Sequence, residues 1–131
     1  MIAVDTSAIV ALALLEPEAK EFSELIGAEG GLTGTPTLFE VRLVLASKMP
    51  EAYADSFMDA FIARPSIHPV AFTLDMYRAA VAAFDRFGRG RHPAKLNFGD
   101  CMAYAVARAH DAPLLFKGDD FALTDVRAAF P

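Results

Sequence analysis

Residues 1–11 read Met-Ile-Ala-Val-Asp-Thr-Ser-Ala-Ile-Val-Ala, and the segment changes character at Asp5. The apolar residues Ile2 to Val4 are too few for a helix and are typical of a buried strand. Beyond Asp5, a Thr-Ser pair offers caps for a helix in the apolar residues 8–15. A carboxylate between a buried strand and a helix lies where open α/β sheets bind their ligands. Asp5 is therefore either a helix cap or the first residue of a polar site.

Composition predicts one globular domain that spans residues 1–131. Hydrophobic residues make up 54% of the chain and charged residues 22%, which is enough apolar material for a core. The longest apolar run, residues 8–15, is far shorter than the ~20 residues of a membrane-spanning helix, and no basic region precedes it as in a secretory signal. Cys101 is the only cysteine, so no internal disulfide forms. These features favour a cytoplasmic protein that does not associate with membranes.

Apolar periodicity and turn residues divide the chain into alternating short strands and helices. Strands are expected at residues 2–4, 32–34, 67–72 and 114–116. Helices are expected at residues 8–15, 18–26, 36–49, 51–63, 73–87 and 97–110, and residues 122–131 add a last turn and an edge strand. This order predicts a single α/β domain, with a central parallel sheet of four to five strands flanked by helices.

Two helical stretches carry many large apolar side chains. In residues 36–63 they outnumber the positions that a small core needs. Core packing is one interpretation of this surplus, and a dimer or partner surface is the other. In the helix expected at 73–87, four large apolar residues share one side: Leu74, Tyr77, Val81 and Phe84.

Acidic residues recur at comparable positions of the expected sheet. Asp5 and the pair Asp119-Asp120 each follow a strand, Asp100 starts a helix, and Glu40 lies early in a helix. Strand ends and helix starts of such a sheet share one rim, so these carboxylates would repel one another unless a cation neutralised them. Oxygen ligands without a cluster of His or Cys favour a hard ion such as Mg²⁺ or Mn²⁺.

A basic segment lies beside the acidic residue at position 100. Arg86, Arg89, Arg91 and Lys95 are four of the twelve Lys and Arg residues of the chain. The formal net charge of −5 argues against a broad nucleic-acid-binding surface but leaves room for a local one. The segment is either a solubilising loop or, together with Lys117, a phosphate-contacting edge of an acidic metal centre.

Four motifs together resemble the PIN-domain ribonucleases, and more narrowly the VapC toxins of bacterial toxin–antitoxin pairs. They are Asp-Thr-Ser at 5–7, Glu40, Asn-Phe-Gly-Asp-Cys at 97–101 and Leu-Leu-Phe-Lys-Gly-Asp-Asp-Phe-Ala-Leu-Thr-Asp at 114–125. The resemblance covers the whole chain and implies a PIN domain over residues 1–131. It also implies a metal-dependent endoribonuclease, with Mg²⁺ as the ion and Mn²⁺ as its substitute, acting on single-stranded or looped RNA.

The resemblance implies that Asp5, Glu40, Asp100 and Asp120 are the catalytic acids and that Asp5 and Asp100 bind the metal. The family pattern Gly-x-Asp-Phe leaves Asp119 in the variable position, although the residues themselves leave both members of the pair open. Hydroxyl groups of residues 6 and 7 and the amide of residue 97 are expected to orient the carboxylates. The expected partners are the RNA substrate, a VapB-like antitoxin whose tail covers the acidic pocket, and a second copy bound through the helices of residues 36–63.

Two other functions compete with the nuclease. An aspartyl-phosphate phosphotransferase would use Asp5 as nucleophile, but the haloacid-dehalogenase pattern needs a second Asp at the place of Ser7. A catalytically inactive PIN-fold binding module is the other alternative, and against it stands the presence of every expected acid. Trapped aspartyl-phosphate would identify the first, and metal binding without RNA cleavage would identify the second.

Overall fold

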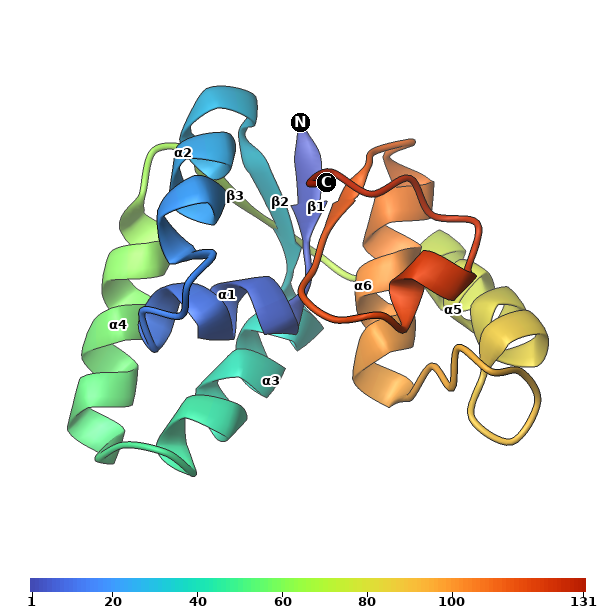
Figure 1. Ribbon diagram of the computed structural model, residues 1–131, viewed down its shortest axis with the longest axis horizontal. Coiled ribbons are helices and arrows are strands. Elements are labelled where there is room, and N and C mark those ends of the chain that lie inside the picture. The colour runs from blue at the N-terminus through green and yellow to red at the C-terminus, as the bar shows by residue number, and fades with distance from the viewer.

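The computed structural model describes all residues, 1–131, as an α/β fold of three layers (Figure 1). A parallel sheet stands in the middle, helices α1 to α4 cover one face, and helices α5 and α6 cover the other. The elements in chain order are β1 (Ile2–Val4), α1 (Thr6–Ala13), α2 (Ala19–Glu29), β2 (Gly31–Gly34), α3 (Thr35–Ala46), α4 (Glu51–Ala63), β3 (Ile67–Val70), α5 (Leu74–Phe87), α6 (Phe98–Ala109), β4 (Leu114–Leu115) and the short 3-10 helix η1 (Phe121–Leu123).

The order of strands in the sheet is β3-β2-β1-β4, and every neighbouring pair is parallel. The chain adds β2 and β3 on one side of β1 and returns to place β4 on the other, with Ala3 paired to both Leu32 and Leu114. The direction of winding therefore reverses next to β1. Ligands of open α/β sheets bind at this point, beyond the carboxyl ends of the strands, and Asp5 follows the carboxyl end of β1.

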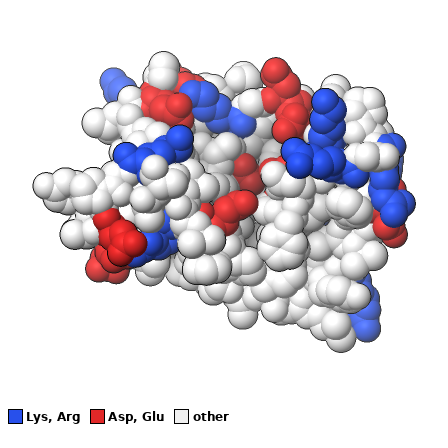
Figure 2. Space-filling model, turned by 90° about the horizontal axis from the view of Figure 1, so that it is seen from below, with Lys and Arg blue, Asp and Glu red and all other residues white.

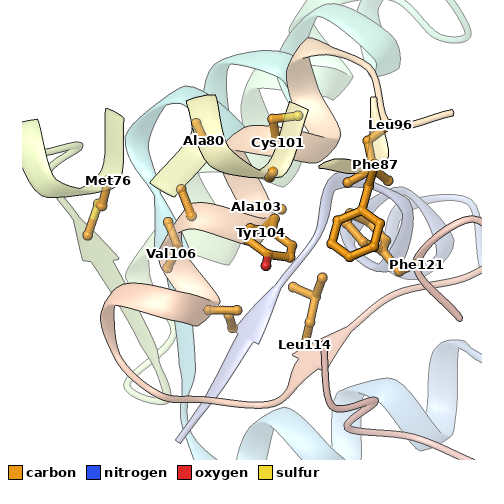
Figure 3. Packing of buried hydrophobic residues seen from close by; sticks show 14 of the residues in the cluster. Met76, Ala80, Phe87, Leu96, Cys101, Ala103, Tyr104, Val106, Leu114 and Phe121 are labelled. Carbon is orange, nitrogen blue, oxygen red and sulfur yellow. The ribbon is translucent and has the colours of Figure 1, made fainter. Parts of the chain in front are cut away.

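Alternating residues of β1 contribute to two separate cores, because successive side chains of a strand point to opposite faces. Ile2 and Val4 pack with α1 to α4, whereas Ala3 packs with α5 and α6. Alanines on the buried side of α6 let this helix approach the sheet and α5 closely. Figure 3 shows α6 side chains of this second core, Cys101, Ala103, Tyr104 and Val106, among Met76, Ala80 and Leu114.

The expected order of strands and helices is confirmed, with differences at the edges. The expected fifth strand is reduced to one parallel bridge between Leu114 and Ala128. The strand expected to reach residue 72 ends at Val70, and as the outer strand β3 tolerates Pro69, which lacks an amide hydrogen. None of the helices combines the length and hydropathy needed to cross a bilayer.

The apolar side that the sequence shows in residues 73–87 faces solvent. Tyr77 is 57% exposed and Val81 is 43% exposed, and Leu74 and Phe84 are exposed as well. The helix instead buries the side that carries Met76, Ala80, Ala83 and Phe87. Small alanines allow α6 to pack tightly there, so close packing rather than side-chain size determines which side of α5 is buried.

Candidate active site

Asp5 both caps a helix and contributes to a polar site. It has extended backbone angles at the N-cap of α1, and its Oδ2 accepts hydrogen bonds from the Ser7 amide (3.0 Å) and the Ser7 hydroxyl (2.6 Å). The residue is only 3% exposed, and its second oxygen, Oδ1, is buried without a hydrogen-bond partner. Burying a carboxylate oxygen without a hydrogen-bond partner costs free energy, so Oδ1 is the oxygen of Asp5 that is free to bind a ligand.

Ser7 joins the ends of two neighbouring strands. Its hydroxyl donates to Asp5 and accepts a hydrogen bond from the Lys117 amide, 2.9 Å away, just beyond β4. The structure does not support the expectation that Lys117 holds phosphate, because its ammonium group pairs with Glu16 (3.2 Å) and Glu18 (3.1 Å). These two carboxylates raise the pKa of Lys117 and occupy its charge.

Glu40 reaches the site from the first half of α3. The Thr6 hydroxyl donates a hydrogen bond to Glu40 Oε1, which links α3 to the start of α1. The other side of the Glu40 carboxylate lies against Gly99, in the first turn of α6, so closely that a Cβ on Gly99 would overlap it. Glu40 is therefore held between two helix starts.

Asp100 stands at the amino end of α6 in a reciprocal cap. Its amide donates to Asn97 Oδ1 (2.9 Å), and its Oδ2 accepts from the Asn97 amide (3.0 Å). This capping box satisfies two backbone donors that helix geometry leaves free and fixes the carboxylate at the helix terminus. The backbone amide of Asn97 therefore orients the Asp100 carboxylate.

The two acids that follow β4 point to different places. Asp120 lies close enough for its charge to raise the pKa of Asp100. Asp119 instead lines a separate pocket of about 460 Å³ with residues that include Glu18, Phe22 and Lys117. The structure thus brings Asp120, and not Asp119, toward the other acids.

Mutual repulsion of the acids shows in their pKa values. Burial raises the pKa of Asp5 to about 7, the hydrogen bonds from Ser7 oppose the rise, and the charges of Asp100 and Glu40 add to it. Burial also raises the pKa of Asp100, as do Asp120 and Glu40, whereas the Asn97 amide and Arg89 lower it. The four acids therefore form one electrostatic group.

A hard divalent cation fits this donor set. No three Asp, Glu, His or Cys side chains stand close enough together to form a ligand cluster, and the carboxylates of Asp5, Glu40 and Asp100 are each held by hydrogen bonds. All the donors are oxygens, however, and the group includes the unpartnered Asp5 Oδ1. Oxygen donors of this kind suit Mg²⁺ and related ions, which keep several water ligands beside one or two carboxylates.

The basic segment is an ordered loop beside the acids. A bridge between Gly88 and Leu96 closes it, and Leu96 is fully buried. Arg89 is close enough to lower the pKa of Asp100, whereas Arg86 pairs with Asp125 at 3.2 Å. In Figure 2, which views the lower side of Figure 1, acidic side chains lie in a central hollow and basic side chains gather to their right.

Two contributors to this region were missing from the sequence-based set. Gly99 leaves space for the Glu40 carboxylate. The sequence hints at this role only by a glycine in the first turn of a helix, where the backbone does not require glycine. Asp125 accepts a hydrogen bond from Tyr104 (2.7 Å) and pairs with Arg86 and Arg108, which ties the end of the chain to α5 and α6. No spacing pattern in a single sequence identifies such a long-range anchor.

Comparison with known proteins gives one consistent family. The PIN domain model matches residues 2–127. Ribonuclease VapC of Mycolicibacterium smegmatis is 40% identical over 95% of this chain and 97% of its own. Ribonuclease VapC30 of Mycobacterium tuberculosis is 39% identical over 94% of each.

Solved structures share the fold. Mycobacterium tuberculosis VapC20, described as a sarcin-ricin loop cleaving toxin, superposes with a TM-score of 0.77 at 18% identity over 96% of both chains. Rickettsia felis VapBC2, bound to a DNA fragment from its promoter, gives a TM-score of 0.77 at 14% identity over 98% of this chain and 97% of that one. The family match argues against the phosphotransferase alternative. This protein belongs to the PIN-domain family and, within it, to the VapC ribonucleases.

Proposed function

We propose that the protein is a Mg²⁺-dependent endoribonuclease that hydrolyses phosphodiester bonds in single-stranded or looped RNA. The observation that carries the proposal is the buried, unpartnered Oδ1 of Asp5, on which the charges of Asp100 and Glu40 act. Ribonucleases of this family generally depend on a divalent metal. The proposed catalytic acids are Asp5, Glu40, Asp100 and Asp120.

Asp5 and Asp100 are the proposed metal ligands, with Mn²⁺ as a substitute for Mg²⁺. A divalent cation held by these residues would lower the pKa of a water molecule and stabilise negative charge on the leaving oxygen. Ser7 and Asn97 keep the two ligands in place through the hydrogen bonds described above. Glu40 and Asp120 accept hydrogen bonds from the attacking water or complete the set of ligands.

RNA binding is assigned to the basic loop. Arg89 lies nearest the acids, and Arg91 and Lys95 are exposed on the same loop. Cationic side chains at this edge offset the repulsion between a phosphate backbone and an acidic centre. Single-stranded or looped RNA is favoured, because the edges of its bases are accessible, whereas the deep major groove of an RNA duplex is not.

The neighbouring acids Asp119 and Asp120 provide a matched test. We expect wild-type protein to cleave a labelled, loop-rich RNA in Mg²⁺ and to stop in EDTA. Asp120→Asn is expected to lower the cleavage rate at least about tenfold, and Asp119→Asn, one residue away in another pocket, is the control. The proposal would be contradicted by cleavage that persists in EDTA. Metal binding without any cleavage would instead identify a binding module.

The protein is also proposed to be the toxin of a toxin–antitoxin pair, inhibited by a VapB-like antitoxin. Structures of the same fold include VapBC2 of Rickettsia felis and a toxin–antitoxin complex from Klebsiella pneumoniae. We expect the product of a short neighbouring reading frame to co-purify with the protein and to block RNA cleavage. A neighbouring product that binds without blocking cleavage would contradict the proposed inhibition.

A homodimer is proposed as well, and it has two candidate surfaces: the helices of residues 36–63, as the sequence suggests, and the exposed side of α5 with α6. Residues 36–63 bury Met58 and Phe61 and expose four large apolar side chains, Phe39, Leu43, Tyr53 and Ile62. The exposed side of α5 presents Leu74, Tyr77, Val81 and Phe84 on successive turns, and it borders an apolar groove of about 360 Å³. Exposed apolar surface of this kind marks partner sites. Light scattering should give a dimer for wild type and a monomer for Val81→Glu, whereas an intact dimer in that variant would place the surface on α3.

A further inference from the structure

Gly99 occupies a position where the backbone does not require glycine. It is the second residue of α6, and its φ is not among the positive φ values of the chain. Glycine is about 1 kcal/mol less favourable than alanine within a helix, although the difference is smaller in the first turn. The reason for a glycine must therefore lie in the space beside it.

That space is filled by one carboxylate. The three atoms nearest to a Cβ on Gly99 would all belong to Glu40: Oε2, Cδ and Oε1. The overlap would be severe, whereas a Cβ on Gly118 would meet no atom. The Glu40 carboxylate thus rests on the bare backbone of Gly99, at a helix amino end, where the helix dipole favours negative charge.

We propose that Gly99 is a positioning residue: its missing side chain forms the seat that holds the Glu40 carboxylate beside the two metal ligands. Thr6 fixes the carboxylate from the opposite side through its hydrogen bond to Oε1. The charge of Glu40 raises the pKa values of both Asp5 and Asp100, so its carboxylate lies near both proposed ligands. This inference rests on the proposed metal-dependent nuclease and names the residue that places its third carboxylate.

A methyl group at position 99 would disturb the site more than the fold. The atoms that it meets are the far end of a flexible side chain, not backbone, so the Glu40 carboxylate would swing away while α3 and α6 stay in place. Alanine also favours the helical conformation over glycine. The fold is therefore retained, and the loss falls on metal affinity and cleavage.

The test is a double-mutant cycle with Mn²⁺ as the probe. Gly99→Ala should melt at or above the wild-type temperature, bind Mn²⁺ about 10- to 100-fold more weakly in calorimetry, and cleave RNA correspondingly more slowly. Glu40→Asp shortens the side chain by one methylene and withdraws the carboxylate from the seat. In the Glu40→Asp background, adding Gly99→Ala should therefore cost less than threefold in Mn²⁺ affinity.

Gly27→Ala is the matched control, because Gly27 is also helical and a Cβ there would meet only Arg64, at an ordinary 3.8 Å. It should leave Mn²⁺ affinity unchanged. Three results would refute the proposed role of Gly99. Gly99→Ala could bind Mn²⁺ as tightly as wild type, it could melt well below the wild-type temperature, or it could lose the same Mn²⁺ affinity in the wild-type and the Glu40→Asp backgrounds. If wild type itself bound no Mn²⁺ and cleaved no RNA, the proposed function would fail instead.

Discussion

Asp5, at the start of α1, and Asp100, at the start of α6, form what we call the first and the second wall of the site, and they are held in different ways. Asp5 lies in the β1–α1 junction, is almost fully buried and keeps one oxygen without a partner. Asp100 lies at the start of α6, is less buried, and has Arg89 and Asp120 nearby. Burial makes an unneutralised charge at the first wall expensive, which is why we propose that Asp5 binds a cation. Because the second wall is partly exposed, we propose that RNA approaches from this side.

The largest expected effect is the loss of cleavage when either wall loses its carboxylate. Asp5→Asn and Asp100→Asn should each lower the rate of Mg²⁺-dependent cleavage by more than about 100-fold, because each removes a proposed ligand rather than its support. Gel assays with nuclease-free preparations measure this. If one variant kept its activity, its carboxylate would not be a metal ligand, and the metal would be held by the other wall alone.

Stability should separate the two walls. Folding raises the pKa of Asp5 from 3.8 to about 7, so folded protein binds its proton more tightly than unfolded protein does. The stability that this contributes is complete below the unfolded pKa and is lost as the pH rises through about 7. In EDTA, the free energy of unfolding of Asp5→Asn minus that of wild type should grow by on the order of 2 kcal/mol between pH 5 and pH 8.

Urea titrations of wild type, Asp5→Asn and Asp100→Asn at the two pH values give this measurement. The corresponding growth for Asp100→Asn should be smaller, because Asp100 is less buried and Arg89 opposes the rise of its pKa. A difference that stays constant with pH for Asp5→Asn would contradict the raised pKa that burial gives to Asp5.

RNA binding at the second wall should weaken as the salt concentration rises. Replacing Arg89 and Arg91 by Ala should weaken binding of single-stranded RNA and reduce the slope of log affinity against log salt by about 1.4, or ~0.7 for each phosphate contact. Fluorescence anisotropy at several salt concentrations measures the slope. The control replaces Lys20 and Lys48, which lie in α2 and just beyond α3, by Ala. An equal reduction of the salt slope in this control would show that the effect comes from total charge and not from the loop.

The smallest expected effect concerns the support behind the second wall. Tyr104 of α6 donates a hydrogen bond to Asp125, and burial together with this carboxylate raises its pKa to about 12. The folded state therefore favours the neutral phenol, and this stability is lost as the pH rises from about 10 through about 12. Tyr104→Phe should cost about 1 kcal/mol at pH 7 and show a weaker alkaline loss in thermal melts. An unchanged alkaline loss would assign it to other groups.

The first wall could be predicted from the sequence because its contacts are local. Asp5 and Ser7 are two residues apart, and a strand followed by an acid and two hydroxyl residues predicts a helix start. The sequence favoured Thr6 or Ser7 as the cap, but the structure has Asp5 as the cap and both hydroxyl residues inside α1. The same holds for Asn97 and Asp100, three residues apart. The order of strands and helices also followed from local periodicity, and so did the rim on which the acids lie.

The rest depends on contacts between distant segments. Glu40 meets Thr6 across 34 residues of sequence, and Gly99 meets Glu40 across α3 and α6. The buried side of α5 depended on the alanines that face α6, whereas periodicity drew attention to the larger residues on the other side. Lys117 was expected near phosphate, but Glu16 and Glu18, a hundred residues earlier, hold its charge.

The most direct test of the central claim is a calorimetric titration with Mn²⁺ of wild type, Asp5→Asn and Asp119→Asn. If the unpartnered oxygen of Asp5 marks a cation site, wild type and Asp119→Asn should bind Mn²⁺ with the same affinity, and Asp5→Asn should show no binding in the same range. Equal binding by Asp5→Asn and wild type would contradict the account, because the ion would then lie away from the wall that β1 and α1 build.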